Sequence, residues 1–345
     1  MHEHYAEREQ CRHEVSRVGM NAEATIYSST VHSTSRYPPT WNTFLSTLYS
    51  LLFFCTFAAM RNVKIIVCCH KQDIMAKEPP FMPLQVGKAI AKVDLGIQGD
   101  NTGDNISAKN GSYCEMTGMY WAWKNLKDVD VIGLCHYRRY FDFHGQCRWM
   151  RNCDVFPTSK FAELNLDIPD KILSRIQKGT AVVAMPKHYM SSLALDYCYA
   201  HLSDDVRTLQ QVVCDTQPEY VRRTYYDVMY NNNSLIHYNM FLMTWSDFDA
   251  YCHWIFPLLA EVEARTDISS YNPVQARIYG YMAERLFNVW LYAEHMHLIK
   301  RPLLWVRDEP LKRDPSAFTI IERNLRGWLI NCLARGHGRD LTECL

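Results

Sequence analysis

The chain has 345 residues, of which 48% are hydrophobic and 21% are charged. These fractions are typical of a folded globular protein and exclude a mainly disordered, collagenous or coiled-coil chain. The 37 Lys and Arg residues balance the 37 Asp and Glu residues, so the formal net charge is zero. Proteins that coat nucleic acid usually carry a basic excess, and we therefore expect no nucleic-acid partner.

The cysteine pattern indicates reduced thiols. The chain has 13 cysteines, an odd number, and no two of them have the CxxC spacing. Cys68, Cys69 and Cys135 lie inside apolar runs that are typical of buried strands. We therefore expect a cytoplasmic protein with structural thiols, and disulfides or a metal site are the less favoured alternative.

Residues 1–59 differ from the rest of the chain. They show no helical or strand period until an apolar run at 44–59. Sixteen residues form a helix of about 24 Å, which is short for a hydrocarbon layer of about 30 Å. We expect a poorly ordered N-terminal extension, with Met60 as the functional start of the chain. A weak apolar anchor is the alternative.

From residue 60 to about 310, short apolar strands alternate with helical stretches. This order predicts a single α/β domain with a mostly parallel central sheet and flanking helices. The expected strands are 64–71, 130–141, 180–188 and 234–245, and the expected helices are 110–126, 170–179, 247–265 and 276–295. In the helix at 110–126, Ser112 and Glu115 have the spacing of a capping box.

Residues 311–345 form a third region, in which apolar residues recur at helical spacing and predict an amphipathic helix. These residues are Phe318, Ile321, Leu325, Trp328, Leu329, Cys332 and Leu333. Such a helix either packs back onto the domain, which we slightly favour, or makes peripheral contact with the inner face of the membrane.

In sheets of this kind the ligand lies beyond the carboxyl ends of the strands. The residues at those ends are His70 and Lys71, the HYRR tetrad at 136–139, and 186–188, which includes Lys187. Arginine forks bind phosphate oxygens, and strand alternation would turn only one of Arg138 and Arg139 into the cleft. We expect that residue to be Arg138. The alternative is an arginine pair bound to surface carboxylates.

Other motifs narrow the chemistry. The GxGxxG, GxxxxGK[ST] and GxSxG motifs are absent, so a dinucleotide dehydrogenase, a P-loop NTPase and the simplest serine hydrolase are not expected. The Asp-Val-Asp sequence at 128–130 resembles a metal-binding Asp-x-Asp, but it opens a strand, and we interpret it as a solvated turn. The polar loop at 96–107 is a candidate for contacts with sugar or ribose hydroxyls, or an exposed turn without a ligand.

Two further polar groups lie in apolar surroundings. Glu284 is either half-buried with a raised pKa or paired with Arg277 or Arg285. His237 and Asn239 flank a tyrosine and are candidates for holding sugar hydroxyls, although a buried core histidine is an equal alternative.

Six segments together resemble a known family: KIIVCCHK, PLQVG, GDNIS-x-KN, YCEMTGMYWAWKN, GLCHYRRYF and GYMAERLFNVWL. They occur in the same order over residues 62–306. The chain resembles the bacterial capsular and exopolysaccharide biosynthesis glycosyltransferases formerly labelled as a domain of unknown function. That resemblance implies a single GT-A-like, Rossmann-like domain.

The resemblance also implies a reaction. The donor would be a nucleoside-diphosphate sugar, with galactose or galactofuranose as sugars of some members. The acceptor would be a glycan or lipid-linked glycan of a capsule, exopolysaccharide or O-antigen. HYRR would stand in place of a metal-binding Asp-x-Asp, which leaves a need for Mn²⁺ or Mg²⁺ open.

The resemblance and the residues themselves together assign roles to individual residues. If the reaction inverts, Glu284 or an aspartate of the 100–104 loop such as Asp104 would be the base, and Arg138 or Arg139 would stabilise the leaving group. The acceptor-binding residues would be Lys187, His237 and Asn239. The donor-binding residues would be His70, Lys71, Asp104, Asn105, Lys109, His136, Tyr137, Arg138 and Arg139.

Two other classes of function stay open on the sequence. One is a sugar-nucleotide-binding module without catalytic activity. The other is a metal-dependent hydrolase built on His70, His136 and His237.

Overall fold

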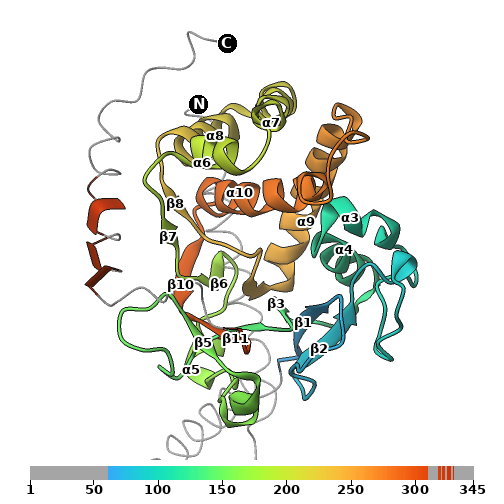
Figure 1. Ribbon diagram of the computed structural model, residues 1–345, viewed down its shortest axis with the longest axis vertical. Helices are drawn as coiled ribbons and strands as arrows, with labels where there is room; N and C mark the ends of the chain where they lie inside the picture. The colour runs from blue at the N-terminus through green and yellow to red at the C-terminus, as the bar shows by residue number, and fades with distance from the viewer. Residues whose placement is uncertain (1–60, 310–317, 320, 323–324, 328, 330–345) are drawn as a thin grey trace, which may run out of the picture. The chain divides into compact units, whose positions relative to one another are not determined.

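The computed structural model describes residues 61–309, together with 318–319, 321–322, 325–327 and 329 of the tail. The expected extension at 1–59 and most of the expected C-terminal helix lie outside these residues. Figure 1 shows the described elements along the chain.

A nine-stranded sheet forms the centre of the fold. Its core runs in the order β2-β1-β3-β9-β6-β10, and a hairpin at the end of β3 leads to β4, β11 and β5. The strands are β1 (Val63–Cys69), β2 (Phe81–Gln85), β3 (Val131–His136), β4 (Arg139–Phe141), β5 (Cys153–Phe156), β6 (Thr180–Ala184), β9 (Phe241–Thr244), β10 (His297–Arg301) and β11 (Leu303–Val306). A separate two-stranded sheet pairs β7 (Lys187–His188) with β8 (Ser234–Leu235).

The sheet is mixed. β1 is parallel to β2 and β3, β6 is parallel to β10, and β5 is parallel to β11. β9 runs antiparallel to β3 and β6, and β4 runs antiparallel to β3 and β11. The predicted α/β fold with a central sheet and flanking helices is confirmed.

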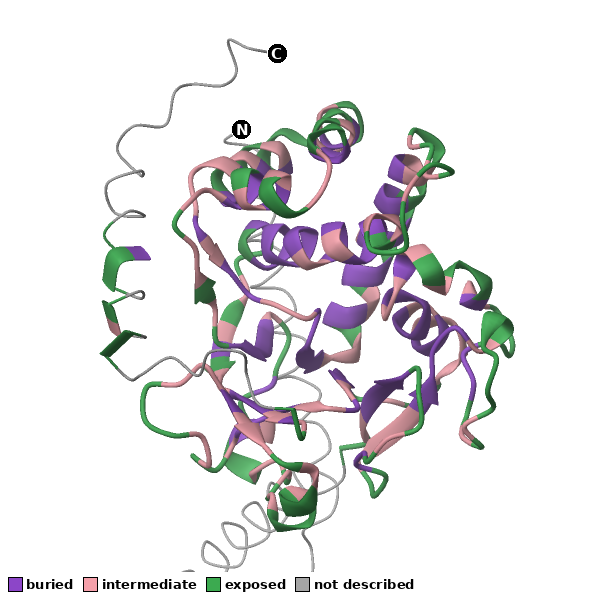
Figure 2. Cartoon of the chain, viewed as in Figure 1, coloured by how far each residue is buried: buried purple, intermediate pink, exposed green. Residues whose placement is uncertain are grey.

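The helices cover the sheet and extend from one end of it (Figure 1). They are α3 (Asn110–Tyr113), α4 (Met116–Asn125), α5 (Asp170–Leu173), α6 (Leu193–Ala200), α7 (Ser203–Thr216), α8 (Glu219–Tyr230), α9 (Trp245–Ala264) and α10 (Ile278–Ala293). Figure 2 shows that α10 and the central strands are mostly buried. β1 is an apolar run covered on both faces, as its sequence predicts.

Two expected elements are broken where the chain turns. The expected strand at 130–141 is β3 and β4, because residues 137–138 form a hairpin turn. The alternation argument for Arg138 is therefore wrong. The expected strand at 234–245 is β8 and β9, because Tyr238 and Asn239 adopt φ values of 74° and 50°.

The expected helix at 110–126 is also interrupted, by Cys114 at φ 53°. The predicted capping box is wrong. Ser112 lies inside α3, where its hydroxyl donates to the carbonyl of Lys109 at 3.2 Å. Glu115 precedes α4 and its side chain makes no capping hydrogen bond. Two other expected elements also differ from the structure. The expected strand at 180–188 divides into β6 and β7, and the expected helix at 170–179 contains only α5.

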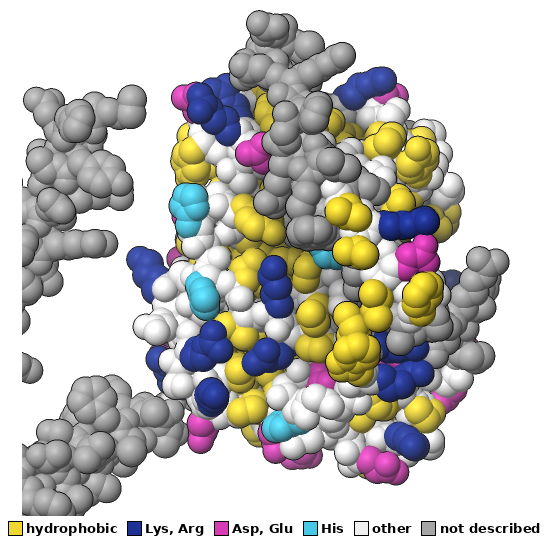
Figure 3. Space-filling view, turned by 90° about the vertical axis from the view of Figure 1, so that its left-hand side faces the viewer, with side chains coloured by type: hydrophobic (Ala, Val, Ile, Leu, Met, Phe, Trp, Pro, Cys, Tyr) yellow, Lys and Arg dark blue, Asp and Glu magenta, His cyan; other side chains and the backbone are white. Residues whose placement is uncertain are grey.

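The described part of the tail touches the domain. Asn233 Nδ2 donates to the carbonyl of Gly327 at 2.8 Å, and Phe318 and Leu325 are exposed. Trp328, Cys332 and Leu333 lie outside the described residues, so the membrane contact stays a prediction. Hydrophobic side chains are intermixed with Lys and Arg on the side of the molecule in Figure 3. Within the described ranges, no helix is both long and apolar enough to span a bilayer.

Candidate functional site

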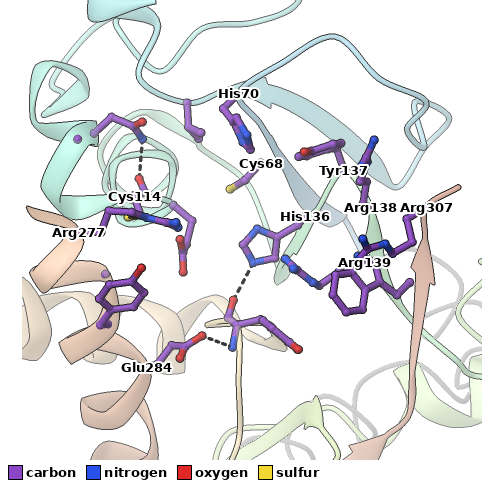
Figure 4. Close-up of a pocket in the computed structure, with 18 of the residues that line it drawn as sticks. Cys68, His70, Cys114, His136, Tyr137, Arg138, Arg139, Arg277, Glu284 and Arg307 are labelled. Atoms are coloured by element: carbon purple, nitrogen blue, oxygen red, sulfur yellow. Dashed lines mark hydrogen bonds between the residues drawn. The ribbon is translucent and has the colours of Figure 1, made fainter. Parts of the chain in front are cut away.

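A cavity of about 680 Å³ lies beyond the carboxyl ends of β1 and β3 (Figure 4). The end of β1, the β3–β4 hairpin, the junction of α3 and α4, helix α10 and strand β11 all contribute to its wall. The structure thus brings together six residues that the sequence singled out: His70, His136, Tyr137, Arg138, Arg139 and Glu284.

Arg138 is held by a carboxylate. Its Nε donates to Asp73 Oδ2 at 2.8 Å, and its Nη2 lies 2.6 Å from the same oxygen. The two side chains are only 23% and 11% exposed. Asp73 therefore neutralises most of the charge that Arg138 would present to an anion.

Arg139 has different partners. Its guanidinium carbon lies 4.5 Å from the ring centre of Tyr238 and 4.8 Å from that of Trp305. The guanidinium carbon of Arg307 also lies 4.8 Å from the ring centre of Trp305. We call these four residues, Tyr238, Arg139, Trp305 and Arg307, the aromatic–arginine stack.

The stack leaves positive charge at the cavity wall. Among the described residues, no carboxylate forms an ion pair with Arg139, and its buried Nε has no hydrogen-bond partner. Arg307 Nη2 does pair with Glu309 at 2.8 Å, while its Nε is also buried without a partner. Buried guanidinium donors without an acceptor are costly, which favours an anionic ligand that supplies one.

Two carboxylates with opposite pKa shifts line the same cavity. Burial, helped by the negative charge of Glu284, raises the pKa of Glu115 to about 7, against a lowering effect of the hydrogen bond from Asn239. Burial also raises the pKa of Glu284, but His237, Arg285 and the Tyr238 N–H outweigh it and lower that pKa overall. Paired titratable groups whose pKa values are pushed apart are typical of acid–base sites.

The peptide of Tyr238 joins the two sides of the cavity. Its N–H donates to Glu284 Oε1 at 2.7 Å, and its carbonyl accepts from His136 Nε2 at 2.8 Å. Figure 4 draws both hydrogen bonds. Burial and the charge of Arg139 lower the pKa of His136 to about 4, so the ring is neutral at pH 7. Its Nε2 proton is the one donated to the carbonyl, which leaves Nδ1 as an acceptor.

The other predicted donor residues do not line the cavity. These are Lys71, Asp104, Asn105 and Lys109. Lys109 pairs with Glu263 at 2.6 Å, and Asp104 accepts a hydrogen bond from Tyr120 at 3.2 Å. These contacts join Asp104 to α4 and Lys109 to α9.

The predicted acceptor residues lie behind the wall or away from it. His237 accepts or donates a 2.8 Å hydrogen bond with the Tyr189 hydroxyl and lies 3.6 Å from Glu284. Lys187 lies over the ring of Tyr189, at 4.5 Å. Asn239 is buried, and its Nδ2 donates to Glu115 Oε1 at 2.8 Å.

Several lining residues were not expected from the sequence. They are Cys114, Glu115, Arg277, Tyr281, Trp305 and Arg307. The sequence predicts Glu115 as part of a capping box, and no glycine marks the break at Cys114, whose φ is 53°. Trp305 lies in β11, and Arg307 follows the end of that strand, with the buried Val306 between them.

The described residues do not gather a metal site: they contain no group of three or more His, Cys, Asp and Glu side chains that could hold an ion. His237 is not on the wall with His70 and His136. Asp128 and Asp130 lie before the start of β3, at the end of the strand opposite to His136, and Asp130 Oδ2 accepts from the N–H of Asn62 at 2.8 Å. The need for Mn²⁺ or Mg²⁺ stays a prediction, and we derive no step through a metal ion.

Comparison with known proteins gives two matches. A structure described as the apo form of WbbM, a bifunctional glycosyltransferase, has 27% sequence identity and a TM-score of 0.64. The match covers 74% of this chain and 47% of that chain, so this chain spans about half the length of that protein. A search of curated proteins found no match. A family model described as a domain of unknown function, DUF4422, matches residues 64–295, which is more than half of the chain, and the chain therefore belongs to the DUF4422 family.

Proposed function

We propose that the protein is a glycosyltransferase that moves a sugar from a nucleoside-diphosphate donor to a hydroxyl group of a glycan or lipid-linked glycan. The likeness to a bifunctional glycosyltransferase supports this reaction class. The cavity volume of about 680 Å³ also lies within the range of sites for small organic ligands. More specifically, we propose a GT-A-type fold, galactose or galactofuranose as the sugar, and capsule, exopolysaccharide or O-antigen synthesis as the pathway.

The observation that carries the proposal is the state of Arg139. Its guanidinium lies on the cavity wall, within 4.8 Å of two aromatic ring centres, with no carboxylate partner among the described residues. A planar fork of this kind matches the oxygens of a diphosphate. We therefore assign the main diphosphate contact to Arg139. The sequence pattern favours Arg138 for this contact, but Asp73 neutralises the charge of Arg138.

This assignment supplies a way to stabilise the leaving group. When the bond between the anomeric carbon and the diphosphate breaks, negative charge accumulates on the phosphate oxygens. A positive charge that is already fixed in place stabilises that charge without reorganisation. Contacts with the Tyr238 and Trp305 rings restrict the Arg139 guanidinium to such a position.

A donor screen with the full chain tests the proposal. The panel contains UDP-, GDP- and CMP-sugars, and the readouts are thermal shift and release of free nucleotide in the presence of glycan acceptors. We expect a UDP- or GDP-sugar to raise the melting temperature and to be turned over, and turnover of CMP-sugars alone would refute the diphosphate donor. Binding without turnover would instead identify a binding module without catalytic activity, and absence of binding across the panel would refute the proposal.

Two neighbouring arginines provide a matched pair for the same assay. Loss of a charge-assisted hydrogen bond costs about 1.5–3 kcal/mol, so we expect Arg139→Ala to weaken nucleotide binding by roughly 10- to 150-fold. We expect Arg138→Ala to have a much smaller effect on binding, because its charge is already paired. The opposite order of effects would place the diphosphate at Arg138.

A further inference from the structure

We propose that Glu115 is the catalytic base that takes the proton from the acceptor hydroxyl, and that Asn239 is the positioning residue that holds its carboxylate. The inference rests on the proposed glycosyltransferase activity and goes beyond it by assigning the proton transfer. It replaces Glu284 and Asp104 as the expected bases.

The backbone directs Glu115 into the cavity. It follows Cys114, whose φ of 53° ends α3, and it precedes the first residue of α4. An acidic residue at this position could cap the helix, but the Glu115 side chain makes no capping hydrogen bond and lines the cavity instead. A left-handed conformation is unfavourable for cysteine and persists only where the surroundings enforce it.

Asn239 is placed by a second left-handed segment. Tyr238 and Asn239 have φ values of 74° and 50°, and the peptide of Tyr238 is fixed by Glu284 on one side and His136 on the other. The resulting position brings Asn239 Nδ2 to 2.8 Å from Glu115 Oε1. Glu284 therefore acts on Glu115 indirectly, by holding the backbone of Tyr238, and is a second positioning residue.

The amide nitrogen of Asn239 donates to Glu115 at 2.8 Å and, at 3.5 Å, to the carbonyl of Gly280. The residue is only 2% exposed, and its Oδ1 is buried without a hydrogen-bond partner. Reversing the amide would place an oxygen against the carboxylate, so the donor orientation is the one that the site requires. An amide donor stabilises the ionised form of Glu115, which is the form that can accept a proton.

Charged and titratable groups from several elements face Glu115. The negative charge of Glu284 opposes ionisation of Glu115, and the positive charge of Arg277 favours it. The electrostatic neighbours with ionisable side chains are Cys68 of β1, Cys114 of the helix break, Tyr251 of α9, Arg277 before α10, and Tyr281 and Glu284 of α10. The thiols and phenols are neutral near pH 7, because burial raises the pKa of each. Glu115 is then partly ionised near neutral pH, where a base is most effective.

The step that follows is a single displacement with inversion at the anomeric carbon. The acceptor oxygen forms a bond to that carbon while its proton passes to the Glu115 carboxylate. The bond from the anomeric carbon to the diphosphate oxygen breaks, and its electron pair leaves with the nucleoside diphosphate. The proton on Glu115 is then released to water, so donor and acceptor give the glycoside, the nucleoside diphosphate and one proton.

Substitution of Glu115 by the neutral amide tests the catalytic role in the full chain. With the donor that the panel identifies, we expect Glu115→Gln to lower kcat by about 10²- to 10⁴-fold while the donor Kd changes little. We also expect the acidic limb of the pH–rate profile to disappear. Retention of more than a tenth of the wild-type kcat by a folded Glu115→Gln protein would refute the proposal.

Two further variants should move the acidic limb in opposite directions. Asn239→Gly keeps the left-handed backbone accessible and removes the amide donor, so the pKa of Glu115 should rise and the limb should shift upward by about one pH unit. Glu284→Gln removes a neighbouring negative charge and should shift the limb downward. Identical shifts, or no shift, would contradict a role for Asn239 in holding the base.

A substrate-independent measurement separates the two proposals. In the full chain labelled with ¹³C at the glutamate carboxyl, one signal should titrate near pH 7, vanish in Glu115→Gln and move to higher pH in Asn239→Gly. An ordinary titration of Glu115 would overturn the inference even where donor turnover is found. If Glu115 titrates as expected but no sugar nucleotide binds, the glycosyltransferase proposal fails, and the catalytic assignment fails with it.

Discussion

Trp305 is the direct partner of Arg139 in the antiparallel ladder between β4 and β11, and its ring centre lies 4.8 Å from the Arg139 guanidinium. The sheet register thus sets the position of the cationic group. Because β4 begins immediately after the hairpin turn that follows His136, the same register fixes where Arg139 meets the cavity.

Removal of the Trp305 ring tests this arrangement. A cation–π contact contributes about 0.5–2 kcal/mol, so we expect Trp305→Ala to weaken nucleotide binding by roughly 2- to 30-fold. Trp305→Phe keeps an aromatic face and should lie between wild type and Trp305→Ala. Isothermal titration with UDP, or with whichever nucleotide the screen identifies, measures the difference. Equal affinity in all three proteins would show that the ring has no part in placing Arg139.

The ion pair between Asp73 and Arg138 should contribute to stability more than to binding. Both partners are mostly buried, so removal of either leaves the other without its counter-ion. We expect Asp73→Asn and Arg138→Ala each to lower the free energy of unfolding by about 1–3 kcal/mol in urea denaturation. The double variant should lose less than the sum, because the second change removes no further pair. Strict additivity would contradict the pairing.

The elements that the sequence predicts well have a clear apolar pattern along their length. The expected helices at 247–265 and 276–295 agree with α9 and α10 to within two residues at each end, and the expected strand at 64–71 contains most of β1. Their signals are local, because each depends on apolar residues at the spacing of one element. The α/β order followed from these segments alone.

The breaks that build the site could not be predicted in this way. Cys114, Tyr238 and Asn239 adopt left-handed backbone conformations without a glycine or proline to mark the turn. The N–H of Tyr238 donates to Glu284 and its carbonyl accepts from His136, and both of these residues are distant from Tyr238 in the sequence. Unbroken elements at 110–126 and 130–141 would place Glu115 inside a helix and turn Arg138 into the cleft, and the breaks reverse both expectations.

We expect Asp128 and Asp130 to have no part in the reaction. They precede β3, at the opposite end of this strand from His136, and Asp128 has a φ of 57°. We expect Asp128→Gly and Asp130→Ala to leave nucleotide binding and turnover within twofold of wild type, although loss of the bond from Asn62 to Asp130 should cost about 1 kcal/mol of stability. Loss of turnover in either folded variant, with Mn²⁺ or Mg²⁺ supplied, would restore the metal-binding interpretation.

His136 should make the fold sensitive to acid. Burial and Arg139 lower its pKa to about 4, whereas a histidine in the unfolded chain titrates near 6.5. As the pH falls from about 6.5 to 4, the unfolded chain therefore takes up a proton that the folded protein does not, and the free energy of unfolding decreases. The stabilisation is fully present above pH 6.5 and is lost as the pH falls through the folded pKa.

Urea denaturation between pH 7.5 and 4.5 measures this dependence. In His136→Gln the amide can still donate to the carbonyl of Tyr238 but cannot be protonated, so the decrease in stability on acidification should be smaller than in wild type. If His136→Gln follows the wild-type curve, the folded and unfolded chains take up a proton at residue 136 alike, and burial does not lower the pKa of His136.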